Sequence, residues 1–222
     1  MTKNPTLKTI AVMQPYFVPY RGYFRLFEEA DLVVLYDCVQ FPRRSFVHRN
    51  RLPDAKGKPA WLTLPLAKAP REALICDLEF AADAEASLRH RARRFPDLQP
   101  LLEDEQNPFG QLLFDLSGTP VEYIAGWLEA CCGVLDIPFQ AVRSSTLRLA
   151  PDLKGQDRIL AICRELGATR YVNAPGGREL YNVDAFQEAG IELKILDEFD
   201  CSNWSVLYQL ITKPLKGRLL ND

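Results

Sequence analysis

Polar and aromatic side chains gather between residues 14 and 23, where an apolar run gives way to a helix-length stretch. The candidates for ligand contact there are Gln14, Tyr16, Tyr20, Gly22 and Tyr23. The Gln14 amide can read a base or a sugar, and tyrosine rings can stack or hydrogen-bond. Backbone amides beside a glycine at a helix start favour anions such as phosphate. The alternative is a proline-stiffened turn packed by its own aromatic rings.

A basic segment follows the second apolar run. From Phe41 to Leu52 it holds four arginines and a histidine but no acid. Guanidinium groups suit phosphate or carboxylate, and this histidine is the one placed for acid–base chemistry. We expect catalytic roles for Asp37 and His48 and ligand contacts from Gln40, Arg43, Arg44, Arg49 and Asn50. Two alternatives stay open: a solvated basic loop and, as a minor one, a stacking surface for single-stranded nucleic acid.

Two more junctions carry polar or glycine-rich sequence. Ser144 and Ser145 follow a short strand pattern, and Gly176 and Gly177 lie between a strand and a helix pattern. Successive amides at glycines can bind an anion, although a plain turn explains the glycine pair equally well. The run from Tyr20 to Tyr23 has the layout of the nucleotidylyltransferase signature His-x-Gly-His, but both histidine positions are replaced. A histidine that polarises phosphate is therefore not expected in this loop.

The elements that position these residues alternate between strand and helix patterns. Residues 9–37 predict a strand, a helix from about 22 to 30 and a second strand. From residue 139 onward, strand patterns near 139–142, 170–173 and 191–196 alternate with helix patterns near 156–166 and 183–189. Strands linked in this way form right-handed crossovers. The predicted fold class is α/β, an open mostly parallel sheet flanked by helices, with a nucleotidylyltransferase-like (HUP-type) first βαβ unit.

The middle of the chain is less regular. Thr119-Pro120-Val121-Glu122 is a capping box that predicts a long buried helix, with Cys131 and Cys132 as core residues on its apolar stripe. A helix is expected over 83–95, strands over 61–66 and, more weakly, 76–80, and a docking helix over 204–211. We expect a single domain over residues 1–222, with residues 42–110 as an insertion or excursion.

Composition narrows the class of protein. The 222 residues can bury a real core, and the net charge of −2 makes a nucleic-acid partner unlikely. No apolar run is long enough to span a bilayer, and residues 1–5 lack a signal-peptide pattern, so a cytoplasmic location is expected. The six cysteines form no Cys-x-x-Cys pair and there are only two histidines, so no metal site is predicted. Neither a cofactor nor an oligomeric state can be assigned from the sequence.

Several of these motifs together resemble the WbqC-like family. The resemblance is carried by Gln14-Pro15-Tyr16-x-x-Pro19-x-x-Gly22-Tyr23-Phe24, Tyr36-Asp37-x-x-Gln40, Arg49-Asn50-Arg51, Ser144-Ser145 and Gly176-Gly177, and it extends over nearly the whole chain. It implies a bacterial protein of surface-polysaccharide or O-antigen biosynthesis that makes or modifies a nucleotide-linked or carrier-linked sugar. Arg21 departs from the pattern, since an apolar residue is expected there.

These observations lead to one leading hypothesis and one alternative. The leading hypothesis is a transferase or ligase-like enzyme acting on a phosphate-bearing small molecule such as a sugar nucleotide, by acyl, aminoacyl or nucleotidyl transfer. In it, Gln14, Tyr16 and Tyr23 shape the pocket, and Arg43, Arg44 and Arg49 hold the anion. The alternative is a non-catalytic protein that binds a sugar nucleotide or scaffolds other enzymes, because both signature histidines are missing.

Overall fold

The computed structural model describes residues 8–212, and its internal contacts divide the chain into two compact units. Unit 1 contains the described residues up to Gln14, then Gly22–Tyr36 and Pro138–Asp200. Unit 2 contains Pro15–Arg21, Asp37–Ile137 and the described residues from Cys201 onward. The excursion expected over residues 42–110 therefore falls inside unit 2, and the single-domain organisation stays a prediction. Residues 1–5, for which no signal peptide is expected, lie outside the described part of the chain.

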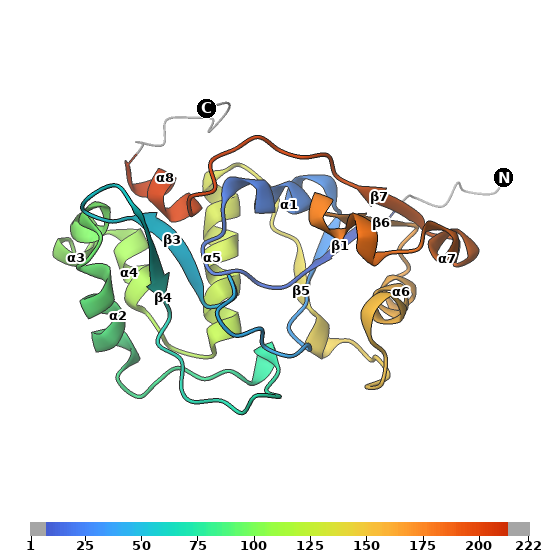
Figure 1. Ribbon diagram of the computed structural model, residues 1–222, viewed down its shortest axis with the longest axis horizontal. Coiled ribbons are helices and arrows are strands. Elements are labelled where there is room, and N and C mark those ends of the chain that lie inside the picture. Colours follow the sequence, from blue (N-terminus) through green and yellow to red (C-terminus); the bar gives the residue numbers. More distant parts are fainter. Residues whose placement is uncertain (1–7, 213–222) are drawn as a thin grey trace. The chain divides into compact units, whose positions relative to one another are not determined.

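Unit 1 is built on a five-stranded parallel sheet with the order β5-β2-β1-β6-β7 (Figure 1). Its strands are β1 (Thr9–Met13), β2 (Leu32–Leu35), β5 (Ala141–Arg143), β6 (Arg170–Asn173) and β7 (Glu192–Ile195). In the register, Ile10 of β1 lies beside Leu32 of β2 and Tyr171 of β6. The predicted α/β class with a mostly parallel sheet is confirmed.

Helices cover both faces of this sheet. They are η1 (Arg21–Phe24), which leads into α1 (Arg25–Glu29), then η4 (Ser144–Thr146), α6 (Gly155–Glu165), η5 (Pro175–Leu180) and α7 (Val183–Glu188). Side chains alternate across a strand, so Ile10 and Val12 pack with α6 while Ala11 points to the opposite face. Helix α1 contacts β1, β2 and β6. Because both faces are covered, β2 is apolar throughout and β1 is apolar after Thr9.

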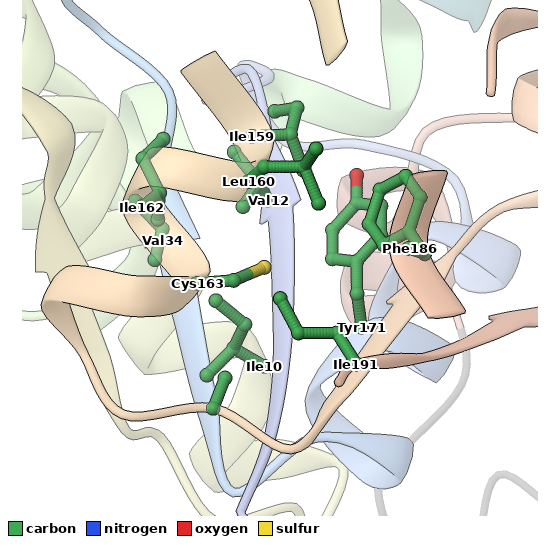
Figure 2. Packing of buried hydrophobic residues seen from close by; sticks show 11 residues of the cluster. Ile10, Val12, Val34, Ile159, Leu160, Ile162, Cys163, Tyr171, Phe186 and Ile191 are labelled. Carbon is green, nitrogen blue, oxygen red and sulfur yellow. The ribbon is translucent and has the colours of Figure 1, made fainter. Parts of the chain in front are cut away.

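The core between the sheet and α6 is shown in Figure 2. Ile159, Ile162 and Cys163 come from α6 and meet Ile10 and Val12 of β1. The Tyr171 and Phe186 rings stack with centroids 5.6 Å apart, and the Tyr171 hydroxyl lies 3.1 Å from that of Tyr181. Burial raises the pKa of the Cys163 thiol to about 12, so this cysteine acts as a small apolar residue.

Unit 2 joins a hairpin to a set of helices. The hairpin strands are β3 (Arg49–Pro53) and β4 (Pro59–Thr63). The helices are η2 (Ile75–Asp77), α2 (Ala84–Ala92), η3 (Pro96–Leu98), α3 (Gln99–Glu103), α4 (Pro108–Phe114), α5 (Pro120–Val134) and α8 (Val206–Thr212). The predicted capping box is present: the Glu122 N–H donates to Thr119 Oγ1, and the Glu122 carboxylate accepts from the Thr119 N–H at 2.9 Å. Cys131 and Cys132 of α5 are fully buried, as predicted.

Three expectations for unit 2 were wrong or incomplete. Part of the basic segment, for which a solvated loop was one alternative, is strand β3, and β4 begins two residues before the predicted strand at 61–66. The strand expected at 76–80 does not form over its first residues. Ile75–Asp77 form the 3₁₀ turn η2 instead. Helices α3 and α4 were not predicted, since each is shorter than two full turns and shows no sustained period.

Candidate functional site

The carboxyl edge of the unit 1 sheet holds one group of candidate residues. Gln14 follows β1, Ser144 and Ser145 begin η4 after β5, and Gly176 and Gly177 follow β6 in η5. Strands β1 and β6 are neighbours, and the chain runs outward from them in opposite directions across the sheet. Such a switch point in strand order is where open α/β sheets bind ligands. Gln14 and the loop after β6 flank this position.

Gln14 and Tyr23 have different roles at this edge. The Tyr23 side chain is buried, and its hydroxyl donates to the Gln14 carbonyl oxygen at 2.9 Å. Tyr23 therefore helps to hold the backbone after β1, beside half-buried Gly22. The half-buried Gln14 side-chain amide has no hydrogen bond to any residue between 8 and 212. This amide is the group at the end of β1 that is available to a ligand.

The two glycines after β6 also differ. A Cβ atom built on Gly177 would lie 2.2 Å from Nδ2 of Asn173, whose side chain is buried at the end of β6. A Cβ on exposed Gly176 would have no atom within 4 Å. Glycine at 177 is thus explained by close packing against Asn173. Ser144 is buried and Ser145 is exposed, so only Ser145 offers its side chain to solvent.

Unit 2 holds the second group, which we call the arginine–aromatic cluster: Tyr16, Phe46, Arg49, Arg51 and Trp61. Arg51 of β3 pairs with Trp61 of β4, and Arg49 lies two residues away on the same face of the hairpin. The Arg49 guanidinium carbon lies 4.1 Å from the Trp61 ring centroid, and that of Arg51 lies 5.7 Å away. Phe46 lies 5.7 Å from Trp61 and 5.6 Å from Tyr16, between centroids.

The positive charge of this cluster is not balanced by a neighbouring acid. The Arg49 guanidinium donates to the Arg44 carbonyl oxygen, and neither Arg49 nor Arg51 forms an ion pair with any described residue. The Nε atoms of both arginines are buried and have no hydrogen-bond partner among residues 8–212. Buried donors in folded proteins are nearly always paired with protein, water or ligand. These two donors of one strand lack the partner that buried donors usually have.

A pocket of about 370 Å³ lies at the start of the basic segment, lined by Gln40, Phe41, Pro42, Arg43 and Arg71. Gln40 Nε2 donates to the Arg71 carbonyl oxygen at 2.9 Å, and Arg43 donates to the Ala69 carbonyl oxygen at 2.8 Å. These bonds fix the walls of the pocket and leave further donors on each guanidinium group. Arg44 is exposed, with φ of 60°.

His48 lies beside this pocket, with its ring edge-on to Phe41 at 5.0 Å between centroids. Burial, followed by the positive charges of Arg49 and Arg91, lowers the pKa of His48 to about 4. The imidazole is therefore neutral at pH 7, and its Nδ1 atom is buried without a hydrogen-bond partner in the described chain. An anion bound nearby would oppose the arginine charges and raise this pKa.

The lowered pKa of His48 predicts an acid-sensitive stability. Since the unfolded chain binds a proton near pH 6.5 and the folded chain only near pH 4, stability is lost as the pH falls between these values. Urea unfolding at pH 7 and pH 4.5 should show a larger loss for the wild type than for His48→Gln. The control His90→Gln removes an exposed imidazole of α2 and should keep the wild-type loss. Equal losses in all three proteins would contradict the prediction.

Asp37 is completely buried, and its carbonyl oxygen accepts from the Cys76 N–H at 2.9 Å. The pKa of the Cys76 thiol is raised to about 11, first by burial and then by the charges of Asp77 and Asp37. The thiol is therefore protonated and a poor nucleophile at neutral pH. Asp37 remains a candidate for proton transfer.

Asn50 lies on the opposite face of β3 and serves the backbone. Its Nδ2 donates to the carbonyl oxygens of Phe17 and Val18 at 3.1 and 2.9 Å, and its Oδ1 accepts from the Arg51 N–H at 2.8 Å. Val18 has φ of 37°, a strained conformation for a β-branched residue. Asn50 thus holds the loop that carries Tyr16 and half-buried Tyr20. The pKa of Tyr16 is raised, first by burial of its side chain and second by the neighbouring Tyr20.

Comparison with known proteins identifies the family. The model of the WbqC-like protein family matches residues 14–209. The chain belongs to the WbqC-like protein family. It is also 27% identical over 204 residues to the uncharacterized protein Rv1507c of Mycobacterium tuberculosis, an alignment that covers 86% of this chain and 83% of Rv1507c. No solved structure matches it significantly.

The predicted site residues of this WbqC-like protein fall into two groups. Unit 1 carries Gln14, Gly22, Tyr23, Ser144, Ser145, Gly176 and Gly177, and unit 2 carries Tyr16, Tyr20, Asp37, Gln40, Arg43, Arg44, His48, Arg49 and Asn50. Sequence reasoning placed Arg51 in the basic segment without giving it a ligand contact of its own, and it did not select Trp61. The two-residue spacing of Arg49 and Arg51 could have placed both on one face of a strand. Trp61 is brought beside them only by the pairing of β3 with β4.

Two further features concern partners of the WbqC-like protein. No helix within residues 8–212 is both long enough and apolar enough to cross a membrane. Over the same residues, His, Cys, Asp and Glu side chains do not gather in groups of three or more that could hold a metal ion.

Proposed function

We propose that this WbqC-like protein binds a phosphate-bearing sugar, such as a sugar nucleotide, and acts on it as a transferase-type enzyme of bacterial surface-polysaccharide biosynthesis. The observation that carries the proposal is the pair Arg49 and Arg51, which share one hairpin face, lack an acidic partner among the described residues and bury unpaired Nε donors. Phosphate oxygens are the acceptors that best match such guanidinium groups.

The sheet of unit 1 supports the same class of ligand. In chain order its strands lie as third, second, first, fourth and fifth, the arrangement of doubly wound nucleotide-binding folds. A nucleotidylyltransferase-like (HUP-type) first βαβ unit is part of the proposal. In it, the Gln14 amide at the end of β1 hydrogen-bonds a ligand hydroxyl or carbonyl.

Proton transfer in the proposed reaction falls to His48 or Asp37. His48 is neutral in the ligand-free protein and can accept a proton, and a bound phosphate makes it a stronger base by opposing Arg49 and Arg91. Asp37 is a buried carboxyl group in the same unit. A cytoplasmic location belongs to the proposal as well, and six free cysteines are typical of a reducing compartment.

The test of this function combines a ligand screen with an arginine variant. Thermal shifts against sugar phosphates and sugar nucleotides identify a ligand, and mass spectrometry follows its turnover with acyl, aminoacyl and nucleotidyl donors. Loss of two charge-assisted contacts in Arg49→Ala/Arg51→Ala should weaken binding by about 100-fold in titration calorimetry. A phosphate-bearing ligand that the double variant binds as tightly as wild type would refute the proposed site.

Arg89→Ala is the matched control for this experiment. Arg89 also lies 4.1 Å from an aromatic centroid, that of Phe114, and it belongs to the same unit. It differs in being paired with Glu85 at 2.9 Å. Its removal should leave ligand affinity unchanged.

A non-catalytic sugar-nucleotide-binding protein is the second candidate. The observation that favours it is the low pKa of His48, because an imidazole with a pKa of about 4 is a weak base before ligand binds. Binding that depends on Arg49 and Arg51 without turnover of any donor would support this candidate over the enzyme.

A further inference from the structure

We propose, building on the proposed function, that the phosphate-bearing ligand is a nucleotide whose base stacks on the arginine–aromatic cluster. The base would extend the stack that the Trp61 indole and the Arg49 guanidinium already form. The phosphates would bind Arg49 and Arg51. A nucleoside diphosphate has both parts.

The first support is the planar stack itself. Trp61 is 36% exposed, and the Arg49 guanidinium carbon lies over its ring, 4.1 Å from the centroid. A guanidinium group at this distance adds a second, charged plane beside the indole. Nucleobases stack on both kinds of plane.

The second support is that this stack is held in place from within unit 2. Phe46 lies between Trp61 and Tyr16, and the Phe17 N–H donates to the Phe46 carbonyl oxygen at 3.0 Å. The opposite face of the hairpin buries Leu52 and Leu62. The cluster is therefore a supported surface on a strand pair, and its rings lose little freedom when a ligand stacks.

The third support is charge. The Arg51 guanidinium carbon lies 5.7 Å from the Trp61 centroid and 6.0 Å from that of Phe46. A positively charged group therefore lies next to both aromatic rings. A sugar phosphate would satisfy the two guanidinium groups and leave the exposed part of the Trp61 indole without a stacking partner. A nucleotide uses both features. A longer nucleic acid is disfavoured by the net charge of −2.

The experiment measures affinities of the full chain by titration calorimetry for uridine and guanosine diphosphates, pyrophosphate, ribose 5-phosphate and a twelve-residue oligothymidine. Base stacking should make the nucleoside diphosphates bind about 10-fold more tightly than pyrophosphate or ribose 5-phosphate. Trp61→Leu should remove this advantage and leave pyrophosphate affinity unchanged, whereas Trp61→Phe should retain most of it. Phe199→Leu is the control, since Phe199 is 45% exposed and lies 5.0 Å from the Arg25 guanidinium carbon in unit 1.

The outcomes separate this inference from the proposed function. Equal affinities for pyrophosphate and both nucleotides, each lost in Arg49→Ala/Arg51→Ala, would overturn nucleotide recognition and leave phosphate binding intact. No binding of any phosphate-bearing sugar would refute the proposed function itself. Oligothymidine binding more tightly than either nucleotide, and dependent on Trp61, would overturn the inference in favour of nucleic acid. If Trp61→Leu does not fold, the affinities of the wild-type protein for nucleoside diphosphates, pyrophosphate and ribose 5-phosphate still test whether the base is recognised.

Discussion

Replacing Asn50 with alanine is expected to lower the free energy of unfolding by about 3 kcal/mol. The side chain is 2% exposed and donates to the Phe17 and Val18 carbonyl oxygens, so its loss leaves two buried acceptors with fewer partners. It also releases a loop in which Val18 has φ of 37°. Ser205 Oγ still donates to the Val18 carbonyl, so the loop keeps one anchor. Urea unfolding at pH 7 measures the change.

Asn182→Ala is the matched control for Asn50→Ala. Asn182 is exposed, and its Oδ1 caps α7 by accepting from the N–H groups of Asp184 and Ala185. Its removal should cost only about 1 kcal/mol. Asn50→Asp keeps the shape but places an oxygen against two carbonyls, and it should be at least as destabilising as Asn50→Ala. If Asn50→Ala and Asn182→Ala lowered the free energy of unfolding by similar amounts, the loop around Phe17 and Val18 would not depend on the Asn50 side-chain amide.

Gly110→Ala is expected to destabilise unit 2 by about 2–3 kcal/mol or more. A Cβ atom at this position of α4 would lie 2.7 Å from the backbone carbonyl oxygen of Leu101 in α3, and backbone cannot move aside as a side-chain tip can. Helices α3 and α4 would have to separate around buried Leu101 and Leu113. The measurement is again urea unfolding, with circular dichroism as the readout.

Gly126→Ala separates this clash from the general effect of adding a methyl group to a helix. Gly126 lies in the interior of α5, and a Cβ there would meet no atom within 4 Å. Alanine favours the helix over glycine by up to about 1 kcal/mol, so this variant should be more stable than wild type. If Gly110→Ala and Gly126→Ala changed the free energy of unfolding in the same direction, a clash between a Cβ atom at position 110 and the Leu101 carbonyl oxygen would be ruled out.

The parallel sheet and its helices were predictable because their signals are local. Apolar runs such as Leu32–Leu35 and the capping box at Thr119 depend on residues within one strand or one helical turn. The buried cysteines of α5 followed from helical spacing alone. The hairpin strand β3 was missed because Arg49, Asn50 and Arg51 are polar, and strand patterns are recognised by apolar residues.

The candidate site was predicted as a set of residue types, and its geometry was not. From the sequence, Asn50 and Arg49 were both expected to contact ligand. In the structure, Asn50 bonds the backbone on one face of β3 while Arg49 stacks on Trp61 on the other. Tyr23 likewise bonds the Gln14 carbonyl. Sequence order does not reveal which polar groups are already used within the fold.

The sequence by itself determined the α/β class, the main helices and the basic, aromatic character of the segment around Arg49. These depend on composition and short-range periodicity. Only the tertiary structure decided that Trp61 lies beside Arg49 and Arg51, that Asn50 supports a strained loop and that His48 is neutral. Each of these depends on burial and on contacts between residues distant in the chain, which pairing and packing create.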